Sequence, residues 1–523
     1  MSIDVSDDVS TDDPHAPQRL PGCGYRRAHA ACHLVLQMCE GRRTEARAML
    51  KALRQMADAH GPLSGHASAL AEGVELRGRD GAIDIGLTLR GLRQLGVSRE
   101  WIERSAARSD AWRQGPAARA WRLGDSGPAA PSHWEGWAAD DQADLVLSLH
   151  GHSAAAVEAL CERVVGQDGF DTVWVELGRL RAERLTEPAP AGREHFGYRD
   201  GLSRPAWVER RTVDGGIGRH PQAVALGELL LGHLNDVGAN PWDFRDLRVQ
   251  DGDPSVDPRA DPNPALDEAR RFFLGASFGV LRKMRQDVGV FQAQVGQAAR
   301  DLAARAGFRQ AMDAQLATEN AQRRRAGLAE RDAAAVADVY IRAQFCGRWP
   351  SGHPMQARDG WFEPTGALAL PDDAGRVHDL PADAPHRGCP AFGSHVRRMN
   401  PRGDPVVPPR RRVVLRRGLP YGAHGDADVG LLGLFFCASI EDQFEHLLGA
   451  WAQQTPMGPD HVGTARDPLI GQHADATAPL EIWLPDGSAM TASLDRPSVL
   501  TQGTLYLLYL GRHGLDQVCG GTR

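Results

Sequence analysis

The chain of 523 residues predicts an α+β fold in which helices pack on one face of a sheet. Strand and helix patterns follow one another without the strict alternation of a parallel α/β protein. Each half of the chain contains such a succession, so we expect a duplicated α+β arrangement. Apolar residues make up 42% of the chain, which allows an ample core, and the length suggests two to four domains.

The first half of the chain carries strand and helix patterns up to residue 180. Strands are predicted at 33–38, 83–89, 143–150 and 171–180. Apolar residues at helical spacing predict helices at 45–59, 91–96 and 154–165. Ser153 is the expected N-cap of the third helix. The stretch 123–142 is rich in glycine, proline, serine and aspartate and predicts a loop.

The second half follows residues 236–267, whose many aspartate, proline and asparagine residues mark a long excursion or an inter-domain connection. Strands are predicted at 272–281, 412–422, 430–440 and 503–510. A helical run is predicted at 291–342, with a break near Gly307, and a further helix at 441–451. The segment 389–402, with Pro390 and Pro401, predicts a loop.

Composition and charge argue against several classes of protein. The formal net charge of −7 disfavours nucleic acid as a partner, because a phosphate-binding surface usually needs a basic excess. The eight cysteines are scattered and form no CxxC pair, so neither a disulfide scaffold nor a zinc module is expected, and a reducing compartment fits. No apolar run approaches 18 residues, so no membrane span is expected.

The start of the chain is acidic and polar and lacks the pattern of a signal peptide. Residues 1–20 are therefore predicted to form a disordered tail. We expect a cytoplasmic location, although encapsulation in a shell or export as the cargo of another protein stays open. The formation of a homo-oligomer stays open as well.

Two loops contain candidate functional residues. In 389–402, His395 lies between a small-residue turn and several arginines, which suits a metal ligand beside Arg398 or Arg402 holding an acidic group. In 194–205, two glycines bracket Asp200, and glycine lets the backbone approach a ligand closely. Residue types alone leave two alternatives open, a solvated loop histidine and an ordinary turn aspartate.

Taken together, six segments resemble the DyP-type (dye-decolourising) haem peroxidases. They follow the order of that family across roughly residues 25–512, and the first matches its GxxDG motif. The segments are Gly197–Gly201 (Gly-Tyr-Arg-Asp-Gly), Leu281–Val288, Gly347–Pro350 (Gly-Arg-Trp-Pro), Cys389–Arg402, Leu415–Gly422 and Ile440–Glu445.

The resemblance implies two ferredoxin-like domains with antiparallel sheets, in a dimeric α/β-barrel-like arrangement. It also implies one haem b per chain, held mainly by the C-terminal half. The expected domains are 21–235, which carries the GxxDG loop, and 236–523, which has a helical insertion around 291–342.

The resemblance also assigns roles to single residues. His395 matches the proximal iron ligand, Asp200 the acid/base on the other side of the haem, and Arg416 the distal arginine. Arg402 matches the arginine that binds a haem propionate, and Leu431 is expected to line the pocket. The second ring nitrogen of the proximal histidine should donate to a carboxylate, and the sequence leaves open whether this is Glu441 or Asp467.

The sequence departs from the family pattern at two places. Gly433 stands where the family often has a phenylalanine, which predicts a roomier distal pocket and either a bulge or a close ligand. No tyrosine follows Tyr421 and Gly422, where some relatives carry a surface radical site, and His424 is nearby instead. Oxidation of bulky dyes at the surface is therefore in question.

The function that follows is a peroxidase. We expect hydrogen peroxide to oxidise ferric haem b to a ferryl state, which then takes single electrons from phenols, aromatic dyes or similar donors. An aspartate base predicts activity best at acidic pH. The first alternative is a haem-handling protein with little turnover, which would need neither Asp200 nor Arg416. The second is an α+β binding module without haem, which would purify colourless.

Overall fold

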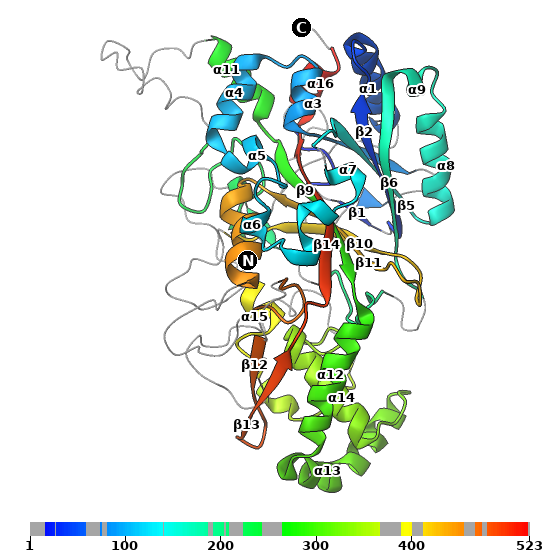
Figure 1. Ribbon diagram of the computed structural model, residues 1–523, viewed down its shortest axis with the longest axis vertical. Coiled ribbons are helices and arrows are strands. Elements are labelled where there is room, and N and C mark those ends of the chain that lie inside the picture. Colours follow the sequence, from blue (N-terminus) through cyan, green and yellow to red (C-terminus); the bar gives the residue numbers. More distant parts are fainter. Residues whose placement is uncertain are drawn as a thin grey trace, which may run out of the picture.

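The structure is a computed structural model of an α+β protein built around one large antiparallel sheet (Figure 1). It describes residues 16–22, 24–26, 28–58, 74–75, 81–139, 141–186, 192–202, 205–208, 223–242, 264–366, 389–399, 412–453, 466–472 and 478–520.

The sheet has eight strands, four from each half of the chain, in the order β10-β11-β9-β14-β4-β5-β2-β6. The N-terminal half contributes β2 (Ala30–Met38), β4 (Ala82–Leu87), β5 (Leu145–Gly151) and β6 (Trp174–Glu183). The C-terminal half contributes β9 (Ser277–Gln286), β10 (Leu415–Tyr421), β11 (Gly430–Cys437) and β14 (Val499–Tyr509).

The two halves have the same strand topology. In each, the first and third strands in chain order lie side by side, the fourth flanks the first, and the second flanks the third. All neighbours are antiparallel, which is the ferredoxin-like order. The halves join where β14 meets β4, and β6 also contacts β10, so the sheet curls toward a barrel. The predicted fold class is confirmed, and the domain boundary at 235/236 stays a prediction.

Helices cover the outside of the N-terminal half of the sheet, with α1 against β4 and α8 against β2 and β5. Ser153 caps α8 as predicted, because its side chain accepts a hydrogen bond from Ala156 N at 3.2 Å. The helices of this region are α1 (Arg43–Asp58), α3 (Leu89–Gln94), α4 (Arg99–Arg108), α5 (Asp110–Gln114), α6 (Ala120–Leu123), α7 (Gly136–Ala139), α8 (Ala154–Val165), α9 (Phe170–Val173), α11 (Pro264–Phe273) and α16 (Arg512–Val518).

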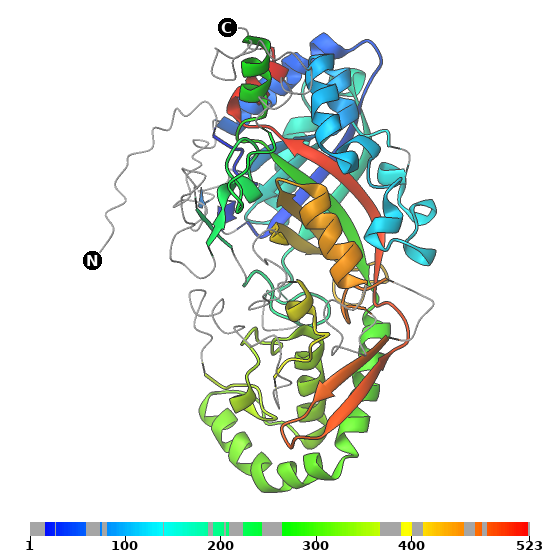
Figure 2. The same ribbon diagram turned by 90° about the vertical axis from the view of Figure 1, so that its left-hand side faces the viewer.

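A second lobe lies below the sheet in Figures 1 and 2 and corresponds to the predicted helical insertion. It contains α12 (Val288–Ala303), α13 (Ala306–Arg325), α14 (Ala333–Cys346) and the hairpin of β12 (Ala478–Trp483) and β13 (Ala489–Leu494). Apolar side chains of these elements form one buried cluster, which also includes Phe196 and Tyr198 from the GxxDG region.

The remaining elements are short. Two pairs of parallel strands are formed by β1 (Tyr25–Arg26) with β3 (Val74–Glu75), and by β7 (Ala206–Val208) with β8 (Ala223–Ala225). Single turns of 3₁₀ helix occur at η1 (Gly127–Ala129), η2 (Pro131–His133), η3 (Leu226–Glu228) and η5 (Ala357–Asp359).

The structure corrects several predicted boundaries. The stretch 123–142 is not a plain loop but contains η1, η2 and α7, since Trp134 and Trp137 bury their rings against the sheet. The strand predicted at 272–281 begins only at Ser277, because the two phenylalanines before it belong to α11. The start of the predicted tail lies outside the described residues, whereas Gln18 is buried and its side chain donates to Ile85 O and Leu510 O.

The inside of the barrel contains a polar layer among apolar side chains. Ser148 Oγ bonds His33 Nδ1 at 2.9 Å and Tyr509 OH at 3.2 Å, and Tyr25 OH donates to Asp84 Oδ2 at 2.6 Å. Apolar side chains from both halves of the sheet surround this layer. Among the helices of the described residues, none is long and apolar enough to cross a membrane.

Asp84 predicts a pH dependence of stability. Burial raises the pKa of Asp84 to about 6, although the hydrogen bond from Tyr25 favours the charged form. Since the pKa in the unfolded chain is lower, Asp84 contributes stability below about pH 4 that is lost as the pH rises through about 6. The free energy of unfolding of the wild type should therefore fall by about 3 kcal/mol over this pH range. We expect Asp84→Asn to abolish this fall. Denaturant titrations of both proteins from pH 4 to 7 measure this, and parallel curves would contradict it.

Candidate active site

His395 is the first residue of a short helix, α15 (His395–Met399), which lies against α14 and the π-helix η7 (Ile440–Ala452). The loop predicted for this segment therefore contains one helical turn. The imidazole Nδ1 of His395 lies 3.0 Å from Asp467 Oδ2, and the histidine side chain is 20% exposed. No hydrogen bond to the Nε2 atom is found within the described residues, so this nitrogen can bind a ligand.

Asp467 is fixed by more than His395. Its Oδ1 accepts hydrogen bonds from Leu469 N at 2.8 Å and Ile470 N at 3.1 Å, and its own N–H donates to Ala452 O. Burial alone would raise the pKa of Asp467, but His395 and Arg398 outweigh burial and lower the pKa. A buried, ionised carboxylate is thus held against Nδ1, where it fixes the orientation of the ring.

The segment before His395 is held by side chains from neighbouring helices. Gln344 of α14 donates to Cys389 O at 3.2 Å and accepts from Ala391 N at 2.8 Å. Arg398 is completely buried and donates to Gly393 O and to Trp451 O, each at 2.9 Å. The arginine predicted to hold an acidic group therefore also fastens α15 to η7.

The outer face of the C-terminal half sheet is defined by strand register. Leu432, Leu434 and Phe436 belong to the cluster inside the barrel, so the alternate residues of β11 point outward. Those residues are Leu431, Gly433 and Phe435. Residues directly opposite each other share a face, which places Arg416 beside Phe435 and Met284 beside Leu431. Arg416 is exposed, and no partner for its guanidinium is found in the described part of the chain.

Gly433 departs from the expectation of a roomier pocket. The strand pairing runs through this residue without a bulge. A Cβ at position 433 would lie 2.5 Å from the ring of Phe435 and 3.1 Å from Met284 Cε, so these two side chains cover the glycine. The space that a phenylalanine would take is partly filled by the ring of Phe435.

The GxxDG loop is anchored at the ends of β9 and β10. Glu194 accepts hydrogen bonds from Phe196 N and Tyr198 N at 2.9 and 2.8 Å, and from Gln286 Nε2 of β9. His195 Nε2 bonds Tyr421 O at 2.9 Å at the end of β10. These residues place the loop at the end of the sheet that carries Leu431.

Asp200 is exposed, and its Oδ1 accepts from Gly201 N at 2.6 Å. Among the described residues no contact joins Asp200 to Arg416, so the two predicted distal residues do not touch. Both flanking glycines have positive φ, with values of 91° at Gly197 and 76° at Gly201, which favours glycine at these positions.

The Gly-Arg-Trp-Pro segment links the two sides of the site. A Cβ at Gly347, the C-cap of α14, would lie 3.1 Å from both Ser394 Oγ and Val396 Cβ of the His395 segment. Pro350 O accepts from Arg199 N of the GxxDG loop at 3.1 Å. Met284 and Val396 also pack on the same apolar cluster. The segments of the predicted site therefore border one region.

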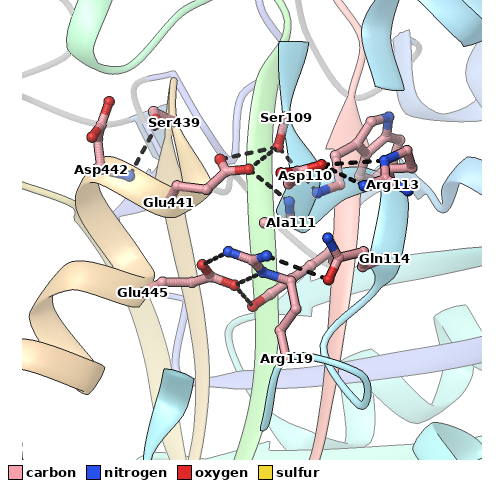
Figure 3. A network of polar contacts seen from close by, with 12 residues as sticks. Ser109, Asp110, Ala111, Arg113, Gln114, Arg119, Ser439, Glu441, Asp442 and Glu445 are labelled. Carbon is pink, nitrogen blue, oxygen red and sulfur yellow. Dashed lines mark hydrogen bonds and ion pairs between the residues drawn. The ribbon is translucent and has the colours of Figure 1, made fainter. Parts of the chain in front are cut away.

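The N-terminal half holds η7 through two carboxylates (Figure 3). Glu441 accepts from Ser109 Oγ and from Ala111 N at 2.6 Å, so it caps α5 and is not the acceptor for His395. Glu445 pairs with Arg119 at 2.5 Å, and both side chains are buried. Removing one partner of such a pair typically costs about 3–5 kcal/mol, so this contact fixes η7 firmly.

The structure resolves one alternative that the sequence left open and adds residues that it missed. Asp467 contacts His395, whereas Arg402 lies outside the described residues. Gln344, Glu194 and Arg119 support the site and were not predicted. Their partners are far away in sequence, so residue types and local spacing carry no signal for them.

Comparisons with known proteins agree on one family. The model of the C-terminal part of Dyp-type peroxidases matches residues 379–460. The chain is 28% identical over 425 residues to the multifunctional dye peroxidase DyP2 of Amycolatopsis sp., which covers 75% of this chain and 72% of that protein. It is 28% identical over 182 residues to the dye-decolorizing peroxidase AauDyP1 of Auricularia auricula-judae, over 29% of this chain and 34% of that protein.

Solved structures of the same family share the fold. A dye-decolorizing peroxidase in complex with 2,6-dimethoxyphenol has a TM-score of 0.68 at 18% identity, with 97% of this chain and 100% of that chain covered. A fungal DyP-type peroxidase from Auricularia auricula-judae has a TM-score of 0.66 at 18% identity, with 98% and 99% covered. The family model spans His395 and the solved structures share the ferredoxin-like fold, so the chain is similar to the DyP-type peroxidases in both respects.

Proposed function

We propose that the protein is a DyP-type peroxidase that binds one haem b per chain, with His395 as the iron ligand, and uses hydrogen peroxide to oxidise small aromatic donors. The observation that carries the proposal is the hydrogen bond between His395 Nδ1 and the buried carboxylate of Asp467 at 3.0 Å. This hydrogen bond leaves Nε2 as the atom that binds iron, and it makes the imidazole a stronger electron donor to the metal.

The residues present fit a haem group. His395 is partly exposed, although Asp467 behind it is buried, so its free nitrogen faces away from the core. Arg416 lies on the outer sheet face together with Leu431. Its guanidinium is exposed and has no partner among the described residues, so it can pair with an anionic group. We propose that Leu431 and Phe435 line the distal side of the haem. Arg402 is proposed to bind a propionate.

Haem, when bound, supplies an iron centre that takes up the oxidising equivalents of peroxide and accepts single electrons from donors. The protein supplies the proton transfer. Asp200 is proposed to take a proton from one oxygen of hydrogen peroxide and to give it to the departing oxygen. Arg416 is proposed to stabilise the negative charge on the departing oxygen, since guanidinium is permanently charged. For this step, the GxxDG loop must bring Asp200 toward the outer sheet face.

Phenols and aromatic dyes are the proposed electron donors. This proposal draws support from a relative named as a multifunctional dye peroxidase and from a related structure that binds 2,6-dimethoxyphenol. A cytoplasmic location and a homo-oligomer stay predictions. The alternative of a haem-handling protein is not favoured, because the relatives are peroxidases and the chain keeps both Asp200 and Arg416.

Haem affinity separates the two carboxylates that the sequence left open. We expect His395→Ala to lose haem and Asp467→Asn to weaken haem binding about 10- to 100-fold, because the ligand ring loses its acceptor. Glu441→Ala is the matched control and should lose clearly less haem affinity than Asp467→Asn, since Glu441 contacts α5 and not His395. Titration of haem into each protein, followed by absorption, measures the affinity. Equal losses in Asp467→Asn and Glu441→Ala would contradict the assignment.

The proton transfer is tested by the rate of reaction with peroxide. We expect Asp200→Asn to keep haem but to react about 10²- to 10⁴-fold more slowly, and Arg416→Leu to react about 10²- to 10³-fold more slowly. Stopped-flow absorption after mixing with peroxide gives these rates. Asp426→Asn is the control, because Asp426 is also an exposed turn aspartate that accepts a backbone N–H. A wild-type rate in Asp200→Asn would overturn its role.

A further inference from the structure

Helix α14, which is labelled in Figure 1, contacts both loops of the candidate site. Gln344 and the C-cap Gly347 lie against the segment that carries His395. Arg342 contacts the GxxDG loop, which carries Asp200. Since two residues turn a helix by about 200°, the side chains of Arg342 and Gln344 point to different sides of α14. One helix therefore holds both loops, each from a different side.

Arg342 binds the GxxDG loop through both its side chain and its backbone. Its Nη1 donates to Phe196 O at 3.1 Å, and its carbonyl oxygen accepts from Tyr198 OH at 2.8 Å. Asp338, one turn earlier on α14, accepts from Arg342 Nε at 2.6 Å and thereby orients the guanidinium toward the loop. A single residue thus fixes two alternate positions of the loop.

Apolar contacts reinforce the same two positions. Phe196 and Tyr198 are buried, with 4% and 6% of their surface exposed, and belong to the cluster of the second lobe. The ring of Phe196 stacks on Phe291 of α12 at a centroid distance of 4.2 Å, and the guanidinium of Arg342 lies 5.3 Å from the centroid of the Phe291 ring. Asp200 follows two residues after Tyr198 and is exposed. The anchored part of the loop therefore ends close to Asp200, so a shift of this anchor would displace the carboxylate.

We propose that Arg342 is a positioning residue for Asp200. Through Phe196 and Tyr198 it determines where the carboxylate of Asp200 stands relative to the outer sheet face. The inference rests on the proposed function, in which Asp200 transfers a proton of hydrogen peroxide, and it adds a residue that acts through the loop and not on the reacting atoms. A misplacement of about 1 Å can slow a reaction about 10²-fold, so a small shift of the loop is enough to matter.

Kinetics of the haem-loaded, full-length protein test the role of Arg342. We expect Arg342→Gln to bind haem like the wild type, because Gln344 still holds the His395 segment. It should react with hydrogen peroxide about 10- to 100-fold more slowly in stopped-flow absorption. Tyr198→Phe removes only one hydroxyl and should slow the reaction less, in the same direction. A wild-type rate in both variants would overturn the proposal.

Arg104→Gln is the matched control. Arg104 of α4 also pairs with a carboxylate one turn away on its own helix, that of Glu100 at 2.7 Å, and its side chain is 28% exposed compared with 19% for Arg342. We expect this variant to react at the wild-type rate. A loss equal to that of Arg342→Gln would assign the effect to the broken ion pair within a helix rather than to the loop, and would contradict the proposal.

The double variant separates positioning from a general loss of stability. If Arg342 acts through Asp200, Arg342→Gln should not slow the reaction further once Asp200→Asn has removed the carboxylate. A purely structural defect would slow the reaction by the same factor in both backgrounds, and that additive result is incompatible with a positioning role.

Amide hydrogen exchange of the haem-free protein gives a readout that does not depend on activity. Phe196 N and Tyr198 N donate to the side chain of Glu194 in the wild type. We expect these amides to exchange faster in Arg342→Gln than in the wild type, whereas residues 389–399 should exchange as before. Unchanged exchange in the GxxDG loop would show that Arg342 does not hold it, and the proposal would be refuted.

The two single variants distinguish failure of this proposal from failure of the proposed function. A wild-type peroxide rate in Asp200→Asn would end the role of Asp200 in proton transfer, and the positioning role would fall with it. A slow Asp200→Asn variant beside a wild-type rate in Arg342→Gln would remove only the positioning role.

Discussion

The hydrogen bond between His395 and the buried Asp467 is the constraint around which the site is arranged. A carboxylate inside the protein is costly unless it is paired, and here it accepts from one imidazole and two backbone N–H groups. That arrangement fixes one ring nitrogen and leaves the other for a ligand. The short helix α15 can hold this geometry because the buried Arg398 joins it to Trp451 O at the end of η7.

Both halves of the chain are needed to hold this pair in place. The π-helix η7 belongs to the C-terminal half, but its Glu441 and Glu445 bind the N-terminal segment that contains α5 and Arg119 (Figure 3). On the other side of the site, the GxxDG loop comes from the N-terminal half and is fastened through Glu194 to β9 of the C-terminal half. Segments of both halves of the duplicated fold therefore surround the site.

Much of the fold could be predicted from the sequence, because periodic apolar patterns report directly on burial. The helix that follows Ser153 and the apolar strand β11 were found in this way. The β12–β13 hairpin was missed, since its strands are short and its burial depends on helices of the second lobe. Asp467 could be named only as one of two acceptors, and Arg119 not at all, because both meet partners that are remote in sequence. The covering of Gly433 by Phe435 depends on side-chain packing, which residue types do not specify.

The proposed site requires that His395 binds the iron of haem through Nε2 while Nδ1 stays with Asp467. The most direct measurement is a crystal structure of the haem-loaded protein with anomalous scattering recorded at the iron edge. We expect an iron peak at bonding distance from His395 Nε2, with Asp467 still on Nδ1 and with Arg416 and Leu431 on the opposite side of the haem. An iron peak held by another residue, or a His395 turned away from Asp467, would contradict it.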